Sequence, residues 1–185
     1  MTAGLLILIA IIVVLGIWFV AVYNGLVRMR NQVDNAWSQI DVQLKRRHDL
    51  IPNLVEVVKD YMSYEKEVLE NVTKARAAAA GATTVAQSAQ TEGVLTSALG
   101  RLFAVMENYP QLKANQNVGQ LQEELASTEN KIAFARQFYN DSVMTYNNRL
   151  QVIPNNVVAG VCSFPPKDLF TAPEAEKEVP KADLR

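Results

Sequence analysis

The chain contains very few of the residues from which most catalytic and metal sites are built. Its 185 residues include one histidine and one cysteine, whereas zinc sites usually need about three or four protein ligands. The single cysteine, Cys162, has no partner for an internal disulfide. No phosphate-binding loop, dinucleotide-binding glycine motif or GxSxG nucleophile motif occurs. We therefore expect a protein that is not an enzyme and that holds no metal ion or cofactor.

The first part of the chain also lacks charge. No charged side chain precedes Arg28, and residues 3–23 form one uninterrupted apolar run. As a helix this run is about 31 Å long, enough for a hydrocarbon layer of about 30 Å. A cleaved signal peptide has a basic start and a shorter apolar core, which this run does not have. We predict a permanent transmembrane helix over residues 3–23, with Trp18 and Tyr23 at its interfacial end.

Positive charge appears directly after the apolar run, at Arg28 and Arg30. Because lysine and arginine are retained on the cytoplasmic side, this favours a single-pass protein of the cell (inner) membrane with its remaining chain in the cytoplasm. The formal net charge is −1, which argues against a nucleic-acid partner. The basic cluster Lys45-Arg46-Arg47 is interpreted as a solvated helix face.

A long amphipathic pattern follows the apolar run. Apolar positions from Leu26 to Ala75 recur at spacings near three and four, which indicates one long helix with a coiled-coil-like seam. Pro52 lies inside this stripe, so we expect a kink or restart at residues 48–51, with Asp49 as the cap of the restarted part. The helix should end at Gly81, since glycine readily takes a positive φ.

Two further helices carry their own start signals. Thr84 with Gln87 is typical of a capping box that opens the second helix. Asn117 with Gln120 predicts the start of the third, whose apolar stripe extends over residues 121–150.

These patterns predict an all-α fold, since no sheet-forming alternation is prominent. We expect an N-terminal transmembrane helix that continues into an elongated antiparallel bundle of three long soluble helices. The bundle would occupy residues 24–170 and include a short docked C-terminal segment. Residues 171–185 are charged and proline-bearing, which predicts a disordered tail.

Charged residues inside the first seam need an explanation, because a core charge is costly unless it is paired. Arg47 and Glu65 occupy such positions. The simplest interpretation is a set of interhelical ion pairs that fix the register of the helices. The candidates for these pairs and related interactions are Arg46, Arg47, Asp49, Glu65, Glu123, Glu129 and Arg136. The alternative is a ligand groove near Arg46 and Arg47.

Several segments resemble the LemA family, including its MamQ-like relatives. The resemblance covers roughly residues 23–170 and is most specific over Leu44 to Asn53, with further matches such as Tyr109-Pro110 and residues 121–125. It implies a membrane-anchored helical bundle without established catalytic residues. Some similar proteins begin with a lipoprotein signal, which would place the bundle outside the cytoplasm. This chain lacks the corresponding cysteine, so both sides of the membrane stay open.

We therefore expect a bacterial scaffold or adaptor that is held in the lipid bilayer and forms a homo-oligomer or binds another membrane protein. The first soluble helix, about 75 Å long, should extend beyond its partners near the membrane. The side chains that it would leave exposed for self-association are Leu26, Met29, Val33, Ala36 and Trp37. The alternative function is the sensing or binding of an anionic lipid or small ligand between helices near Arg46 and Arg47.

Overall fold

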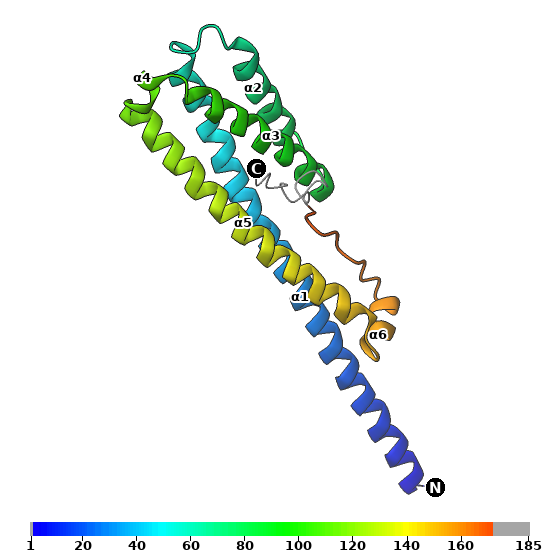
Figure 1. The fold of residues 1–185 in the computed structure, drawn as a ribbon. Coiled ribbons are helices and arrows are strands. Elements are labelled where there is room, and N and C mark those ends of the chain that lie inside the picture. Colours follow the sequence, from blue (N-terminus) through cyan, green and yellow to red (C-terminus); the bar gives the residue numbers. More distant parts are fainter. Residues whose placement is uncertain (1, 172–185) are drawn as a thin grey trace, which may run out of the picture. The chain divides into compact units, whose positions relative to one another are not determined.

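The structure, a computed structural model, describes residues 2–171. These residues form helices and connections without any strand, which confirms the predicted all-α fold (Figure 1). The predicted tail lies outside the described residues except for Thr171. The helices are α1 (Thr2–Lys59), α2 (Lys66–Ala80), α3 (Val85–Met106), α4 (Pro110–Lys113), α5 (Gln116–Gln151) and α6 (Asn155–Val161).

The chain divides into two compact units. Of the described residues, the first unit contains 2–38 and 138–168, and the second contains 39–137 and 169–171. Helices α1 and α5 each contribute one part to each unit. The two units are described separately below.

The first unit begins with the apolar part of α1. Every residue from 3 to 17 is exposed, and the most apolar window of α1 is 0% buried. Among the described residues α1 is the one helix that is long and apolar enough to cross a membrane. An exposed apolar surface of this kind suits the hydrocarbon layer of a bilayer.

The rest of the first unit packs against the following part of α1. Leu26, Val33 and Ala36 are at most 1% exposed, and the Trp37 ring lies 5.5 Å from the ring of Tyr139 on α5. The prediction that this stretch is left free for self-association is therefore wrong for these three core residues. Met29 and Trp37 are half-buried. The expectation failed because α5 is long enough to cover this part of α1.

An extended segment after α6 completes the first unit; we call residues 164–168 the strap. Asn147 exchanges two hydrogen bonds with the backbone of Lys167, at 2.8 and 3.0 Å. The Lys167 ammonium lies 2.8 Å from the carboxylate of Asp34 on α1. Tyr139 and Tyr146 donate their hydroxyl hydrogens to the carbonyls of residues 168 and 165, at 2.8 and 3.0 Å. Side chains of α5 therefore bond to the backbone of residues 165, 167 and 168, while the N–H of Phe164 donates to the carbonyl of Ala159 on α6.

These two tyrosines predict a loss of stability in alkali. Burial raises the pKa of Tyr139, and the carboxylates of Asp168 and Asp34 raise it further. Burial also raises the pKa of Tyr146, where Arg30 acts in the opposite direction. The unfolded chain therefore loses these protons first, so the stabilisation is complete below about pH 10 and is lost as the pH rises through the folded pKa values.

We expect the melting temperature of the first unit to fall steeply above about pH 10. Thermal unfolding of the full chain in mild detergent, followed by circular dichroism over a pH series, measures this fall. The Tyr139→Phe, Tyr146→Phe double variant should be less stable at neutral pH and should show a shallower alkaline fall. Parallel curves for the variant and the wild type would contradict the assignment.

The second unit has a continuous apolar core. The core residues come from α1, α2, α3, α4 and α5, and Leu54, Val58, Met62, Val72 and Leu95 are fully buried. The predicted single helix up to Gly81 is wrong: α1 ends at Lys59, a turn follows, and α2 continues from Lys66 to Ala80. The turn brings α2 back against the core, which buries its apolar face.

The predicted helix starts and ends are partly confirmed. Thr84 caps α3, and its side chain accepts a hydrogen bond from the backbone of Gln87 at 3.2 Å. Asn115, and not the predicted Asn117, accepts the backbone hydrogen bonds at the start of α5. Gly81 follows α2 as predicted but has φ −90°, so its special freedom is not used.

Candidate functional site

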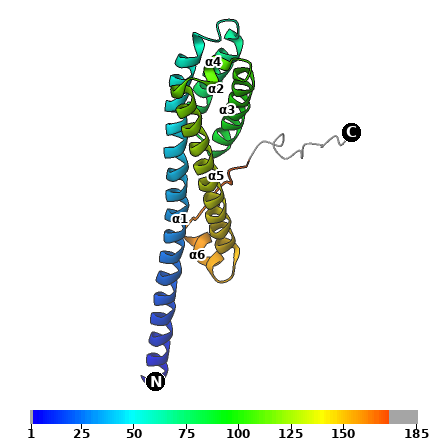
Figure 2. The ribbon, with the colours of Figure 1, turned by 60° about the vertical axis from the view of Figure 1, so that its left-hand side comes forward.

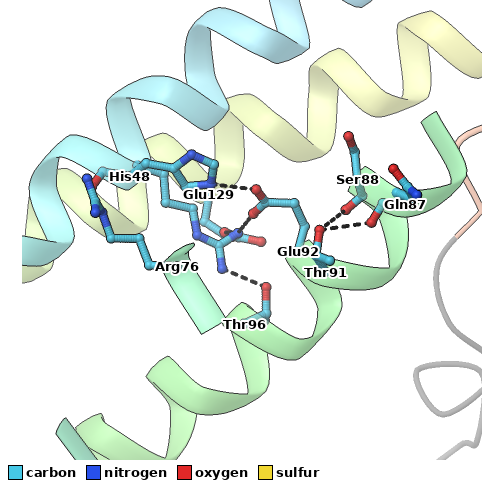
Figure 3. A network of polar contacts seen from close by, with 9 residues as sticks. His48, Arg76, Gln87, Ser88, Thr91, Glu92, Thr96 and Glu129 are labelled. Carbon is cyan, nitrogen blue, oxygen red and sulfur yellow. Dashed lines mark hydrogen bonds and ion pairs between the residues drawn. The ribbon is translucent and has the colours of Figure 1, made fainter. Parts of the chain in front are cut away.

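The most unusual feature of the second unit is a buried cluster of charged and polar side chains (Figure 3). Arg47 of α1 is 1% exposed. Its Nη2 donates to the hydroxyl of Thr96 on α3 at 2.7 Å. Its Nη1 lies 2.8 Å from the carboxylate of Glu129 on α5 and 3.4 Å from that of Glu92 on α3. One arginine thus contacts two other helices.

Glu92 and His48 form the buried end of this cluster. Glu92 is 0% exposed, and its Oε1 lies 2.6 Å from Nε2 of His48. Where the Glu92 carboxylate is ionised it only accepts, so His48 donates in the tautomer that carries its proton on Nε2. The cluster therefore holds two carboxylates around one permanent cation, with the histidine as a further donor.

Pro52 is tolerated inside α1 because of a second arginine. A proline has no N–H, so the carbonyl four residues earlier, that of His48, loses its helical partner. Arg76 of α2 supplies the replacement: its Nε donates to the His48 carbonyl at 2.7 Å. Of the predicted kink or restart at residues 48–51, the restart is wrong: α1 continues to Lys59, and Asp49 is an exposed residue within the helix and not a cap.

This arrangement predicts a specific coupling between two positions. We expect Arg76→Met to destabilise the second unit by about 1.5–3 kcal/mol, because a charged donor to a buried carbonyl is lost. In a Pro52→Ala background the alanine N–H can bond to the same carbonyl, so the loss should be clearly smaller. Urea unfolding of the four proteins of this double-mutant cycle measures the coupling. Equal losses in both backgrounds would contradict it.

A groove lies beside the charged cluster. It has a volume of about 390 Å³. Its lining combines Arg47 and Glu129 with the apolar side chains Leu99, Phe103 and Leu125. Nε of Arg47 and Oε2 of Glu92 are buried without a hydrogen-bond partner. The groove thus has apolar walls and an arginine that retains a hydrogen-bond donor.

The structure brings some of the predicted site residues together. Arg47 pairs with Glu129. At the surface, Nη2 of Arg46 lies 3.5 Å from Oε2 of Glu124. The guanidinium of Arg136 lies over the ring of Phe170, 4.7 Å from its centroid.

The structure places the other predicted residues elsewhere. Glu123 and Asp49 are exposed and do not belong to the cluster. Glu65 is the residue before α2, is half-buried and is not a seam charge. The predicted seam continues through residues 60–65, whereas the structure has a turn there between α1 and α2.

Sequence reasoning missed Glu92, although a signal for it existed. Glu92 precedes Leu95 by three residues and Leu99 by seven, so it lies on the buried stripe of α3. The rule that selected Arg47, a charge at an apolar stripe position, applies to it equally. Thr96 and Arg76 carry no such signal, because their roles depend on how the helices pack.

The chemistry available to this site is electrostatic and steric. Over residues 2–171, no group of three or more histidine, cysteine, aspartate or glutamate side chains is arranged to hold a metal ion. The cluster links α1 to α3 and α5 in the second unit, since Arg47 contacts Thr96 and Glu92 on α3 and Glu129 on α5. The groove beside it can accept an amphiphilic molecule with a hydrogen-bonding head.

Comparison with known proteins places the chain in a family. A model of the LemA family matches residues 36–184. The chain is 27% identical to Protein LemA of Metamycoplasma hominis over 164 residues, covering 88% of this chain and 75% of that protein. It is 24% identical over 174 residues to the magnetosome proteins MamQ 1 and MamQ 2 of Paramagnetospirillum magneticum.

The two MamQ alignments cover 80% of this chain and 64% of each MamQ protein. The chain therefore spans less than two thirds of their length. Because the family model matches most of the present sequence, including the Leu44 to Asn53 block that carries the resemblance, the chain belongs to the LemA family.

Proposed function

We propose that this protein is a non-enzymatic scaffold or adaptor that is tethered to the membrane by α1 and presents its helical units to itself or to other membrane proteins. The observation that supports it is the continuity of α1. An exposed apolar segment over residues 3–17 continues without interruption into the buried part of the same helix. A rigid helix that leaves the bilayer positions whatever it carries at a defined distance from the membrane.

The contact surface that we favour is a groove between α2 and α3 of the second unit. Its volume is about 830 Å³. Small residues line it, including Ala75, Ala78 and Gly93, with Lys74 and Arg101 among its charged neighbours. Small side chains let a second helix approach closely, and the charges can select its polarity. The occupant that we propose is a second copy of the chain.

Light scattering after size-exclusion chromatography in mild detergent tests this proposal. The wild type is expected to be a multimer whose fraction rises with concentration. Val94→Glu changes a groove valine that is 56% exposed and should give a monomer. Val42→Glu is the matched control, because Val42 is 60% exposed, lies in the same unit and does not line the groove.

The two variants separate the parts of the proposal. A clean monomer of the wild type at high concentration would overturn self-association. A multimer that survives Val94→Glu would overturn the assignment to the α2–α3 groove.

The cytoplasmic location of the two units rests on the positive charges after the apolar run and is part of the same proposal. A Cys162→Ser, Ser127→Cys variant places one exposed thiol on α5 of the second unit, outside both grooves. A membrane-impermeant maleimide should leave it unlabelled in intact cells and label it after lysis. Labelling in intact cells would place the second unit on the outer side.

A second candidate function is the binding of an anionic lipid or other amphiphile beside Arg47. The specific observation in its favour is the groove of about 390 Å³ with a buried, incompletely satisfied arginine in its wall. A carboxylate or phosphate head would accept from Arg47, and an acyl chain would contact Leu99, Phe103 and Leu125.

Two glycines allow a clean test of this binding. Gly100 lines the groove, whereas Gly119 does not, and an added Cβ meets no atom within 4 Å at either position. A short-chain phosphatidylglycerol should raise the melting temperature of the wild type and of Gly119→Leu. Gly100→Leu should fill the groove and abolish the rise. An equal rise in all three proteins would exclude this site.

A further inference from the structure

The connection between α5 and α6 exposes a group of apolar side chains; we call it the corner patch. Val152, Ile153, Val157 and Val161 are 52%, 78%, 59% and 72% exposed. All four lie within ten residues of one another in the first unit. Exposed aliphatic side chains that cluster in this way mark an interaction surface.

The corner patch lies near the part of α1 where the apolar run ends. Along α1, residues 3–17 are exposed, Trp18, Phe19 and Val22 are half-buried, and Leu26 is buried. The rest of the first unit therefore already buries α1 partly within the apolar run, before that run ends. Figure 2 shows α6 beside the blue part of α1.

A contact between two aromatic rings places the chain just after α6 beside the end of the apolar run. Phe164 follows α6 by three residues, and its ring meets that of Tyr23 edge-on, with the centroids 5.6 Å apart. The Arg30 guanidinium lies over the Phe164 ring, 5.5 Å from its centroid. Tyr23 ends the apolar run, and an aromatic ring at such an end is typical of the headgroup region. The elements around Phe164 must then lie close to that region too.

The charge of this part of the chain points the same way. The chain has 19 aspartate and glutamate residues. None of them lies in residues 3–33 or 142–167, the two stretches that meet at this end of the first unit. The charged residues of the two stretches are Arg28, Arg30, Arg149 and Lys167. An acid-free surface with arginines next to exposed aliphatic side chains fits the interface of an anionic bilayer.

We infer that the corner patch is a second membrane contact, which inserts its aliphatic side chains at the headgroup boundary of the bilayer that α1 crosses. The partner is the lipid surface itself, with anionic headgroups near Arg28 and Arg149. A bilayer is favoured over a second protein copy because the patch lies beside the end of the apolar run. In the proposed tethering, lipid surrounds that run. The inference rests on the proposed tethering by α1. It adds a contact that would hold the first unit against the membrane instead of leaving it on a free stalk.

Fluorescence quenching on the full chain in vesicles tests the inference. In a Cys162→Ser background, single cysteines replace Val157, Val161, Met144 or Leu8 and carry an environment-sensitive nitrobenzoxadiazole label. The vesicles contain phosphatidylcholine and phosphatidylglycerol, with a nitroxide on some of the lipids. Met144 is the matched control: it is 56% exposed and lies on α5, eight residues before Val152 of the corner patch. Leu8 reports on α1 itself.

We expect labels at 157 and 161 to have blue-shifted emission and to lose about twofold more fluorescence to the lipid nitroxide than the label at 144. Equal quenching at 157, 161 and 144, with strong quenching at 8, would overturn the inference and leave the tethering intact. Absent quenching at 8 would instead overturn the tethering. Labels at 157 and 161 that are shielded from both the lipid nitroxide and aqueous iodide would show a protein contact and overturn the lipid assignment.

A charge variant provides an independent measurement. Val157→Glu, Val161→Glu changes only exposed positions, so the circular dichroism and melting temperature should stay close to those of the wild type. A nitrobenzoxadiazole label on Ile153→Cys should be blue-shifted in the Cys162→Ser background and should lose that shift in the double-glutamate variant, most clearly in vesicles with phosphatidylglycerol. An unchanged blue shift at 153 in a folded double-glutamate variant would contradict insertion of the patch.

Discussion

Replacing Glu92 by alanine is expected to destabilise the second unit by about 3–5 kcal/mol. Arg47 is 1% exposed and would keep one carboxylate partner, Glu129, whose side chain is 41% exposed. Nε2 of His48, now 2.6 Å from Glu92, would lose its acceptor. The variant thus leaves a buried cation undercompensated and a buried donor unsatisfied, which are two of the costliest effects of a single substitution. Urea unfolding in mild detergent, followed by circular dichroism, measures the loss.

Two control variants identify the cause. Glu129→Ala should cost only about 1 kcal/mol, because water can reach the position that Glu129 leaves, while Glu92 remains. Arg47→Met combined with Glu92→Leu removes both buried charges and should recover a large part of the loss of Glu92→Ala. If this double variant is less stable than Glu92→Ala, an uncompensated buried charge is not the explanation.

If these results hold, the cluster specifies the register of three helices more than it adds to their stability. Three helices that bury leucine, valine and alanine can slide past one another by a turn at modest cost, since apolar contacts are not directional. Arg47 reaches Thr96 and Glu129 on two different helices only in one register. In that case the ion pairs specify the structure, as charged residues on apolar stripes of the sequence predict.

The fold class could be predicted from the sequence because the information is local and repeated. Helical spacing of apolar residues marks each long helix, and the uncharged run before Arg28 marks the exposed end of α1. The turn after Lys59 could not be predicted in this way. It contains neither glycine nor proline, and the spacing continues through it. The return of α2 and the full burial of Met62 are tertiary effects, which local spacing does not encode.

The candidate site divides in the same manner. Arg47 and Glu129 could be proposed because a charge on a buried stripe requires a partner on a facing stripe. The bond from Arg76 to the His48 carbonyl could not, since it depends on which helix lies opposite a proline. The strap has no periodic pattern, because three different side chains of α5 bond to its residues 165, 167 and 168.

Replacing Phe164 by alanine is expected to have the largest effect in the first unit, a destabilisation of about 3 kcal/mol. The Phe164 ring is 8% exposed, meets the ring of Tyr23 edge-on and lies under the guanidinium of Arg30. The variant therefore loses apolar burial, an aromatic contact and a cation–π contact at one point. Nothing else in residues 164–168 is both apolar and buried, so no neighbour can fill the space.

Hydrogen exchange of the full chain in lipid nanodiscs measures this loss where it arises. A loss of about 3 kcal/mol corresponds to roughly a hundredfold faster exchange through opening of the unit, in peptides from residues 138–168. Peptides from α3 serve as the internal reference. Met144→Ala is the matched control: its side chain is 56% exposed and lies outside the corner patch, so exchange should be unchanged. If Phe164→Ala exchanges as slowly as this control, the Phe164 ring contributes nothing to the association of the strap with α1.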